Sequence, residues 1–152
     1  MVFTGTLELD TKGFADIIDV TDGVLSLLHE SKISNGLLTV FCTGSTGAMT
    51  TIEYESGVIE DLKKAIERIA PSNMPYAHDK RWGDGNGFSH VRAALMKPSL
   101  TIPVVEGSLT LGTWQQIVLI DFDNRPRERK LIVQIVGESS KGSDSGTPTV
   151  QV

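Results

Sequence analysis

Hydrophobic and polar residues alternate at the start of the chain. Apolar or small residues occupy every second position of residues 2–9, with Thr or Glu between them, which predicts a strand with one buried face. Residues 37–42 form a short, nearly continuous apolar run, which predicts a strand buried on both faces. Further strands are expected at residues 17–20, 49–54, 100–105, 113–122 and 130–136, with turns at 105–108 and 123–126.

Two main helices separate these strands. Val58, Leu62, Ile66 and Ile69 are spaced by four, four and three residues, which predicts an amphipathic helix that Pro71 ends. An earlier helix is expected to be capped by Thr21 or Asp22 and closed at residues 35–36. A third, short helix is expected at residues 91–96.

The element order is strand-strand, helix, strand-strand, helix and three strands. Seven strands with two main helices exclude an all-helical fold. Because helices do not regularly separate adjacent strands, a doubly wound parallel sheet is also disfavoured. The prediction is an α+β fold, a seven-stranded sandwich of two antiparallel sheets with two main helices. Residues 1–138 form one domain, and the Ser/Gly/Thr-rich residues 139–152 are expected to be a flexible tail.

Composition narrows the function classes. The 152 residues carry a formal net charge of −5, which disfavours a general nucleic-acid binder because such proteins need a basic surface. One cysteine excludes an intramolecular disulfide framework and a multi-cysteine zinc site. No apolar run approaches the ~20 residues that cross a bilayer, and no signal peptide is recognisable. The expectation is a cytoplasmic protein without membrane or nucleic-acid partners.

Residues 72–89 are the first place to look for chemistry. They are irregular and rich in Gly, Asp and Asn, but Tyr76, Trp82 and Phe88 are expected to be buried, which argues against disorder. His78 and His90 fall in or beside this segment, and they are candidate ligands for a divalent metal, zinc before magnesium. Ordinary turns and hydrogen bonds are the alternative explanation of the same residues.

Other positions offer weaker signals. Gly44, Ser45 and Thr46 can present amides and hydroxyls to an anion, or can simply form a tight hairpin connection. Glu53 is a candidate base, although surface glutamates are commoner. Trp114 is expected in the core. The basic residues around the last turn, among them Arg129, can grip a phosphate or can remain solvated hairpin charges.

Several short motifs together resemble the YjbQ (UPF0047) family, whose members are also labelled secondary thiamine-phosphate synthases. They are Thr-Gly-Ala-Met-Thr at 46–50, Tyr-Ala-His at 76–78, the residues from Asn86 to His90, Ser-Leu-Thr-Ile-Pro at 99–103, Leu-Gly-Thr-Trp-Gln-Gln at 111–116, and Arg129 followed by Gly-Glu at 137–138. The resemblance extends from about Thr6 to Glu138.

The resemblance implies a seven-stranded two-sheet fold and a homotrimer with clefts at subunit boundaries. It implies that His78, His90, Asp84 and Asn86 form the polar cluster of the cleft, where a metal is plausible, and Glu53 matches an acidic position of the family. Together with the candidates above, the predicted site has His78 and His90 as metal ligands and Glu53 and Asp84 as catalytic carboxylates. Its predicted anion-binding residues are Gly44, Ser45, Thr46, Asn86 and Arg129. One departure matters, since the commoner family pattern has His where Gly44 stands. The missing imidazole removes any acid–base role at that position.

Two functions are expected as alternatives. The first is what the family resemblance implies: a metal-assisted enzyme with weak thiamine-phosphate synthase activity, in which a cation neutralises diphosphate oxygens. Two histidines favour zinc, whereas magnesium–diphosphate chemistry usually draws on several carboxylates, so the main substrate is expected to be another small phosphorylated or anionic molecule. The second function is a non-catalytic trimer that binds a small anion or a metal.

Overall fold

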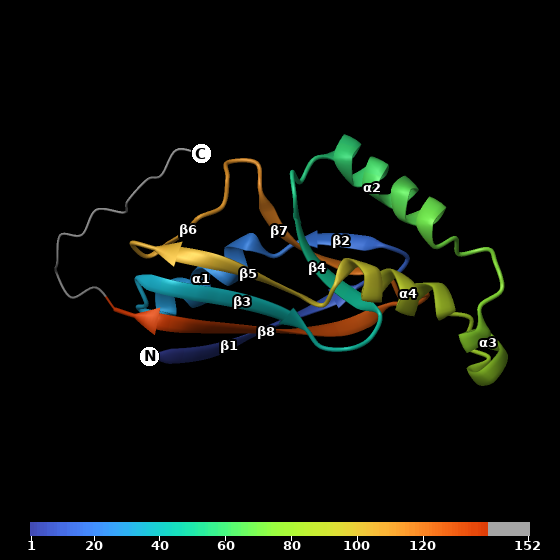
Figure 1. The fold of residues 1–152 in the computed structure, drawn as a ribbon, viewed down its shortest axis with the longest axis horizontal. Coiled ribbons are helices and arrows are strands. Elements are labelled where there is room, and N and C mark those ends of the chain that lie inside the picture. The colour runs from blue at the N-terminus through green and yellow to red at the C-terminus, as the bar shows by residue number, and fades with distance from the viewer. Residues whose placement is uncertain (140–152) are drawn as a thin grey trace, which may run out of the picture.

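The computed structural model describes residues 1–139 and shows eight strands and four helices in that part of the chain (Figure 1). Residues 140–152, nearly all of the predicted tail, lie outside the described residues. The strands are β1 Val2–Thr11, β2 Asp16–Asp19, β3 Asn35–Cys42, β4 Gly47–Ile52, β5 Ser99–Val105, β6 Ser108–Leu109, β7 Gln116–Asp121 and β8 Arg127–Glu138. The helices are α1 Thr21–Ser31, α2 Ser56–Ile69, α3 Ala77–Trp82 and α4 Gly87–Met96.

The strands form two antiparallel sheets. One has the order β1-β8-β3-β5-β6, and the other has the order β2-β7-β4. One cluster of buried residues lies between the sheets and includes Leu38, Met49 and Leu131. A second cluster lies on the other face of the three-stranded sheet, where Ile66 of α2 and Ala93 of α4 cover it. The predicted α+β fold with two antiparallel sheets is confirmed, and the two-residue β6 adds an eighth strand.

Strand β7 is buried on both faces. Ile117 and Leu119 point into the space between the sheets, whereas Val118 and Ile120 point toward α2 and α4. Successive side chains of a strand point to opposite faces, so an almost continuous apolar run is needed here. The same interpretation of residues 37–42 is wrong: Leu38, Val40 and Cys42 are buried, but the alternate side chains lie on the uncovered outer face of the larger sheet.

The first helix differs from the prediction at both ends. It begins after Val20 and not at a Thr21 or Asp22 cap; the Asp19 carboxylate accepts a hydrogen bond from the Thr21 amide at 2.9 Å. It ends at Ser31, where Lys32 adopts a left-handed conformation. Residues 35–36 were expected to close this helix, but they begin β3 because they pair with Glu138 and Gly137 of β8.

The segment at residues 72–89 contains more helix than expected. Helix α3 lies within it, and α4 begins at Gly87 and not at residue 91. Phe88 is buried as predicted, but Trp82 is 66% exposed. No helix among residues 1–139 is long and apolar enough to cross a membrane.

The strand predicted at residues 113–122 is shorter than expected. It begins only at Gln116, and the Trp114 side chain, predicted to lie in the core, is 69% exposed on the preceding loop. Both misplaced tryptophans lie on connecting segments. Whether a large aromatic side chain is buried depends on the elements that pack around it in the fold, and the local sequence does not specify those elements.

Candidate metal and anion site

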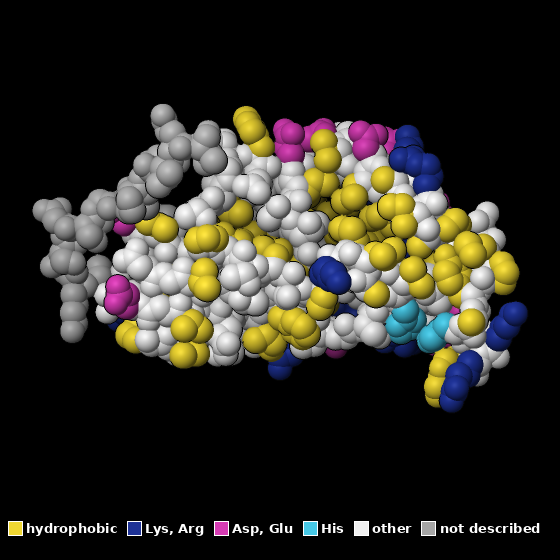
Figure 2. All heavy atoms as spheres, viewed as in Figure 1, with side chains coloured by type: hydrophobic (Ala, Val, Ile, Leu, Met, Phe, Trp, Pro, Cys, Tyr) yellow, Lys and Arg dark blue, Asp and Glu magenta, His cyan; other side chains and the backbone are white. Residues whose placement is uncertain are grey.

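A polar pocket of about 360 Å³ gathers most of the candidate residues. Three parts of the chain line it: the loop between β3 and β4, the segment that carries α3 and α4, and the start of β8. Figure 2 shows histidine side chains near the end of the molecule that carries α3, close to Lys and Arg side chains. The lining residues are Gly44, Ser45, Thr46, His78, Trp82, Asp84, Asn86, His90, Arg127 and Arg129.

The two histidines of this pocket lie against each other. His78 is on α3 and His90 is on α4, and their ring centroids are 4.4 Å apart with an angle of 40° between the ring planes. The turn that joins the helices contains Gly83 and Gly85 in left-handed conformations, with φ of 72° and 66°. Glycine adopts that region without steric cost, so the chain can fold back within four residues and bring the rings together.

Carboxylates surround one nitrogen of the pair. His78 Nδ1 lies 3.4 Å from Asp84 Oδ1 and 3.7 Å from Asp79 Oδ1. Potential ligand atoms of these three residues all lie within 4.8 Å of one another. The Nδ1 atom is buried and makes no hydrogen bond with any described residue. A buried nitrogen without a hydrogen-bonding partner is costly, and nitrogen with carboxylate oxygen is a donor set that zinc accepts, so the residues fit a divalent cation.

Asp79 connects this cluster to the backbone of α4. Its Oδ1 accepts a hydrogen bond from the Gly87 amide at 2.8 Å, and a Cβ at Gly87 would lie 2.5 Å from the Tyr76 Cβ. This close approach of the two segments fixes His78 relative to His90. Asp79 is not among the site residues predicted from the sequence, although it directly follows the candidate ligand His78.

Arg129 forms the floor of the pocket together with a buried carboxylate. Its Nε and Nη2 donate to Asp121 Oδ2 and Oδ1 at 2.7 and 2.8 Å, and Nη2 also donates to Thr46 Oγ1 at 2.6 Å. Burial by itself raises the pKa of Asp121, but the hydrogen bonds from Arg129 and Thr11 outweigh it and hold that pKa below its ordinary value. Asp121 therefore stays ionised. Burial by itself lowers the pKa of Arg129, but its hydrogen bonds to Asp121 raise that pKa above the ordinary value, so Arg129 remains a charged donor beneath the pocket.

A second arginine–aspartate pair lies beside the first. Arg127 donates from Nε to Asp123 Oδ2 at 2.7 Å, and its Nη2 lies 2.6 Å from the same oxygen. Burial raises the pKa of Asp123, while hydrogen bonds led by that of Arg127 lower it to a net value below the ordinary one. The Asn86 amide lies between two carboxylates: one orientation donates to Asp123 Oδ1 at 3.3 Å, and the opposite orientation donates to Asp84 Oδ1 at 3.1 Å.

One predicted residue does not join the group. Glu53 is exposed, directly beyond β4, and does not line the pocket. Strand β4 starts beside the pocket at Gly47 and runs for six residues, which at about 3.3 Å per residue takes its far end about 20 Å away. The remaining predicted residues of this chain, from Gly44 to Arg129, do meet.

Arg127 belongs to the basic group predicted around the last turn, but of that group only Arg129 was expected in the site. Arg127 and Arg129 are two positions apart and so share one face of a strand. Asp121 and Asp123 were not predicted as site residues. No local sequence pattern indicates a site role for the two aspartates. They become partners of the arginines only when β7 and β8 are placed in the fold.

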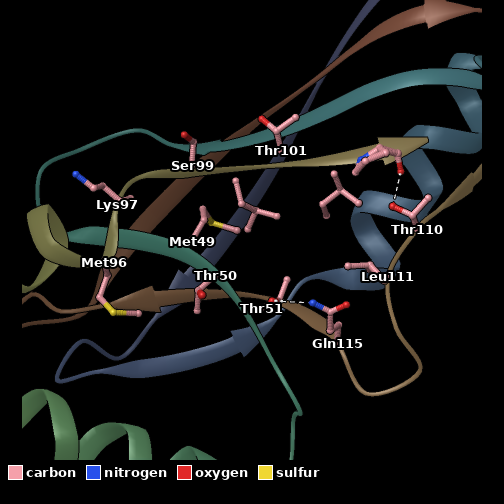
Figure 3. Close-up of a pocket in the computed structure, with 13 residues that line it drawn as sticks. Met49, Thr50, Thr51, Met96, Lys97, Ser99, Thr101, Thr110, Leu111 and Gln115 are labelled. Carbon is pink, nitrogen blue, oxygen red and sulfur yellow. Dashed lines mark hydrogen bonds between the residues drawn. The ribbon is translucent and has the colours of Figure 1, made fainter. Parts of the chain in front are cut away.

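A second pocket of about 430 Å³ lies between β4 and β5 (Figure 3). Met49, Thr50 and Thr51 line it from β4, and Ser99 to Pro103 line it from β5. Its lining contains one charged residue, Lys97, and no His, Cys, Asp or Glu. It therefore offers no good ligands for zinc or magnesium, and the smaller polar pocket is the candidate site.

Known proteins similar to this chain share its fold and match it over nearly the same residues as the resemblance described above. The model of the family described as UPF0047 protein YjbQ-like matches residues 5–138. A UPF0047 protein of Methanothermobacter thermautotrophicus is 39% identical over 137 residues, which cover 90% of this chain and 94% of that protein. One from Archaeoglobus fulgidus is 38% identical and covers 84% and 97% of the respective chains.

Solved structures show the same architecture. A hypothetical protein of Aeropyrum pernix has a TM-score of 0.83 and 32% identity, covering 90% of this chain and 99% of its own. A YbjQ-like protein of unknown function from Sulfolobus solfataricus has a TM-score of 0.82 and 29% identity, covering 91% and 100%. By sequence and by structure, the chain belongs to the YjbQ/UPF0047 family.

Proposed function

We propose that this protein is a metal-assisted enzyme that acts on a small phosphorylated or anionic substrate. The observation that carries the proposal is the buried His78 Nδ1, which has Asp79 and Asp84 around it, His90 against its ring, and no hydrogen-bonding partner among residues 1–139. Such a nitrogen is explained if a cation binds to it.

The chain's own groups suggest how the site works. His78, Asp84 and Asp79 would hold zinc; magnesium fits less well because it prefers carboxylates and water to imidazole. A divalent cation supplies charge stabilisation at a phosphoryl oxygen or an activated water. His90 lies beside His78 and lines the pocket, so it is placed either to complete the coordination or to exchange a proton with a bound substrate.

Weak thiamine-phosphate synthase activity is the specific reaction that we propose to test. It joins a pyrimidine diphosphate to a thiazole phosphate and releases pyrophosphate, so it needs groups that stabilise the negative charge on the departing pyrophosphate. Arg129 and Arg127 line the pocket and support such a role. Asn86 and the Ser45 and Thr46 hydroxyls add hydrogen-bonding groups.

The alternative function is a non-catalytic protein that binds an anion or a metal. Gly44 favours it, because no side chain at that position can transfer a proton. The two functions differ in one assay: only the enzyme restores growth to a bacterium that lacks thiamine-phosphate synthase, or forms thiamine phosphate in vitro.

We expect His78→Ala to lose zinc binding. Zinc-loaded protein, dialysed and analysed for metal, should contain about one zinc per chain in the wild type and less than a tenth of that in the variant, because the variant lacks the central nitrogen ligand. His29→Ala is the matched control, since His29 is exposed on α1, outside the pocket. Equal zinc in wild type and His78→Ala would contradict the proposed centre.

We also propose that the chain forms a homotrimer. Hydrophobic side chains gather on the face shown in Figure 2, over α4 and between α2 and β4. Val58 and Ile69 of α2 and Leu95 of α4 are exposed hydrophobic residues. Such patches are typical of interaction surfaces. Light scattering should give three times the 16.5 kDa of one chain; a monomeric mass at micromolar concentration would refute the trimer.

A further inference from the structure

Arg127 and Arg129 are held in the same way. Each guanidinium uses Nε and Nη2 to bind a buried aspartate, Asp123 or Asp121. In neither case does Nη1 make a hydrogen bond to any residue of the described part of the chain, and both arginines line the polar pocket. Alternate residues of a strand are about 7 Å apart on one face. The two arginines therefore offer neighbouring, pre-oriented Nη1 donors at the pocket.

Gly44 leaves the Nη1 of Arg129 uncovered. Its φ is +107°, and a Cβ at this position would lie 2.9 Å from Arg129 Nη1, with no other heavy atom of the described residues within 4 Å. Any side chain would therefore occupy the space directly above that donor. Ser45 is exposed next to it, so a ligand above Arg129 can also reach a hydroxyl.

The charges around the pocket determine when an anion can bind. Each arginine is already neutralised by its own aspartate, while Asp79 and Asp84 add negative charge beside His78. An anion is repelled by these carboxylates until a cation occupies them. A metal and an anion in the same pocket should therefore bind with positive coupling, each raising the affinity for the other.

We propose that Arg127, Arg129 and the space above Gly44 form an oxoanion subsite, which takes the terminal phosphate of the substrate after the metal has bound. The inference rests on the proposed metal centre and deepens it, because it names the substrate group and the residues that select it. Tetrahedral oxoanions suit the subsite, since guanidinium groups donate in a fixed geometry to phosphate oxygens.

The test uses inorganic phosphate and the intact chain. Zinc affinity is measured first by competition with a chromophoric chelator, and phosphate is then titrated calorimetrically into zinc-loaded and zinc-free protein. The wild type should bind phosphate at least tenfold more tightly when zinc is present. Gly44→Ala should weaken phosphate binding at least tenfold in the zinc-loaded protein and leave zinc affinity unchanged, because it alters no charge. Arg127→Gln should weaken phosphate binding at least tenfold without weakening zinc binding, because it removes a positive charge from the pocket.

The control variants distinguish backbone strain at a glycine with positive φ from occupation of the space above Arg129 Nη1. Gly107→Ala introduces the same change at another glycine with positive φ, +75°, where a Cβ would meet nothing within 4 Å; its phosphate affinity should equal that of the wild type. Arg127→Gln keeps the proposal testable if Gly44→Ala fails to fold. If the protein binds zinc but Gly44→Ala or Arg127→Gln binds phosphate as tightly as the wild type, the oxoanion subsite is overturned and the metal centre is not. Absence of zinc binding in the wild type would overturn the proposed function.

Discussion

Replacing Asp121 with Ala should lower the free energy of unfolding by about 3–5 kcal/mol, because it leaves Arg129 charged, buried and without its carboxylate. Asp121 is fully buried and Arg129 is 7% exposed. That loss is a large part of the roughly 5–15 kcal/mol by which domains are stable. Urea denaturation followed by circular dichroism measures it.

Two further variants identify the cause. Arg129→Met added to Asp121→Ala should recover more than half of the loss, since it removes the uncompensated charge and keeps an apolar side chain of similar length. Glu60→Ala breaks the exposed Glu60–Lys64 pair on α2 and should cost less than about 1 kcal/mol. A loss below 1 kcal/mol in Asp121→Ala would show that this ion pair does not hold the pocket floor in place.

Gly137→Ala should cost about 2–3 kcal/mol through steric overlap inside a sheet. Gly137 of β8 pairs with Gly36 of β3, and a Cβ at Gly137 would lie 2.1 Å from the Asn35 carbonyl oxygen and 2.8 Å from Ile33 Cγ2. The nearest obstacle is backbone, so the strands must separate before the methyl group fits. Chemical denaturation of the purified variant gives the value.

Gly5→Ala is the matched control for this change. Gly5 also lies in a strand of the same sheet, but the three atoms nearest to its Cβ would all belong to the Leu27 side chain, the closest at 2.7 Å. A side chain can rotate where a backbone carbonyl cannot, so the cost should stay below about 1 kcal/mol. If Gly137→Ala were as stable as the wild type, β3 and β8 would not approach as closely as the structure shows.

Much of the fold is encoded in local patterns. The alternation in residues 2–9, the apolar spacing from Val58 to Ile69 and the turn residues around Gly107 gave the order of elements and the two antiparallel sheets. The predictions were wrong where the structure of a residue depends on the elements that pair or pack with it. Residues 35–36 look like a helix end, but their pairing with β8 places them in a strand. Trp82 and Trp114 are exposed because no element among residues 1–139 covers them.

The sequence by itself determined which chemical groups this protein has: two histidines in one polar segment, the small residues at 44–46, and basic residues after the last turn. Only the tertiary structure decided which of them meet. It brought the rings of His78 and His90 to 4.4 Å and left Glu53 at the far end of a strand. It also joined Arg127 and Arg129 to buried aspartates. The physical reason is that hydrophobic periodicity and local composition determine secondary structure over short stretches of chain. A site forms only when sheet register and the packing of α3 and α4 bring distant residues together.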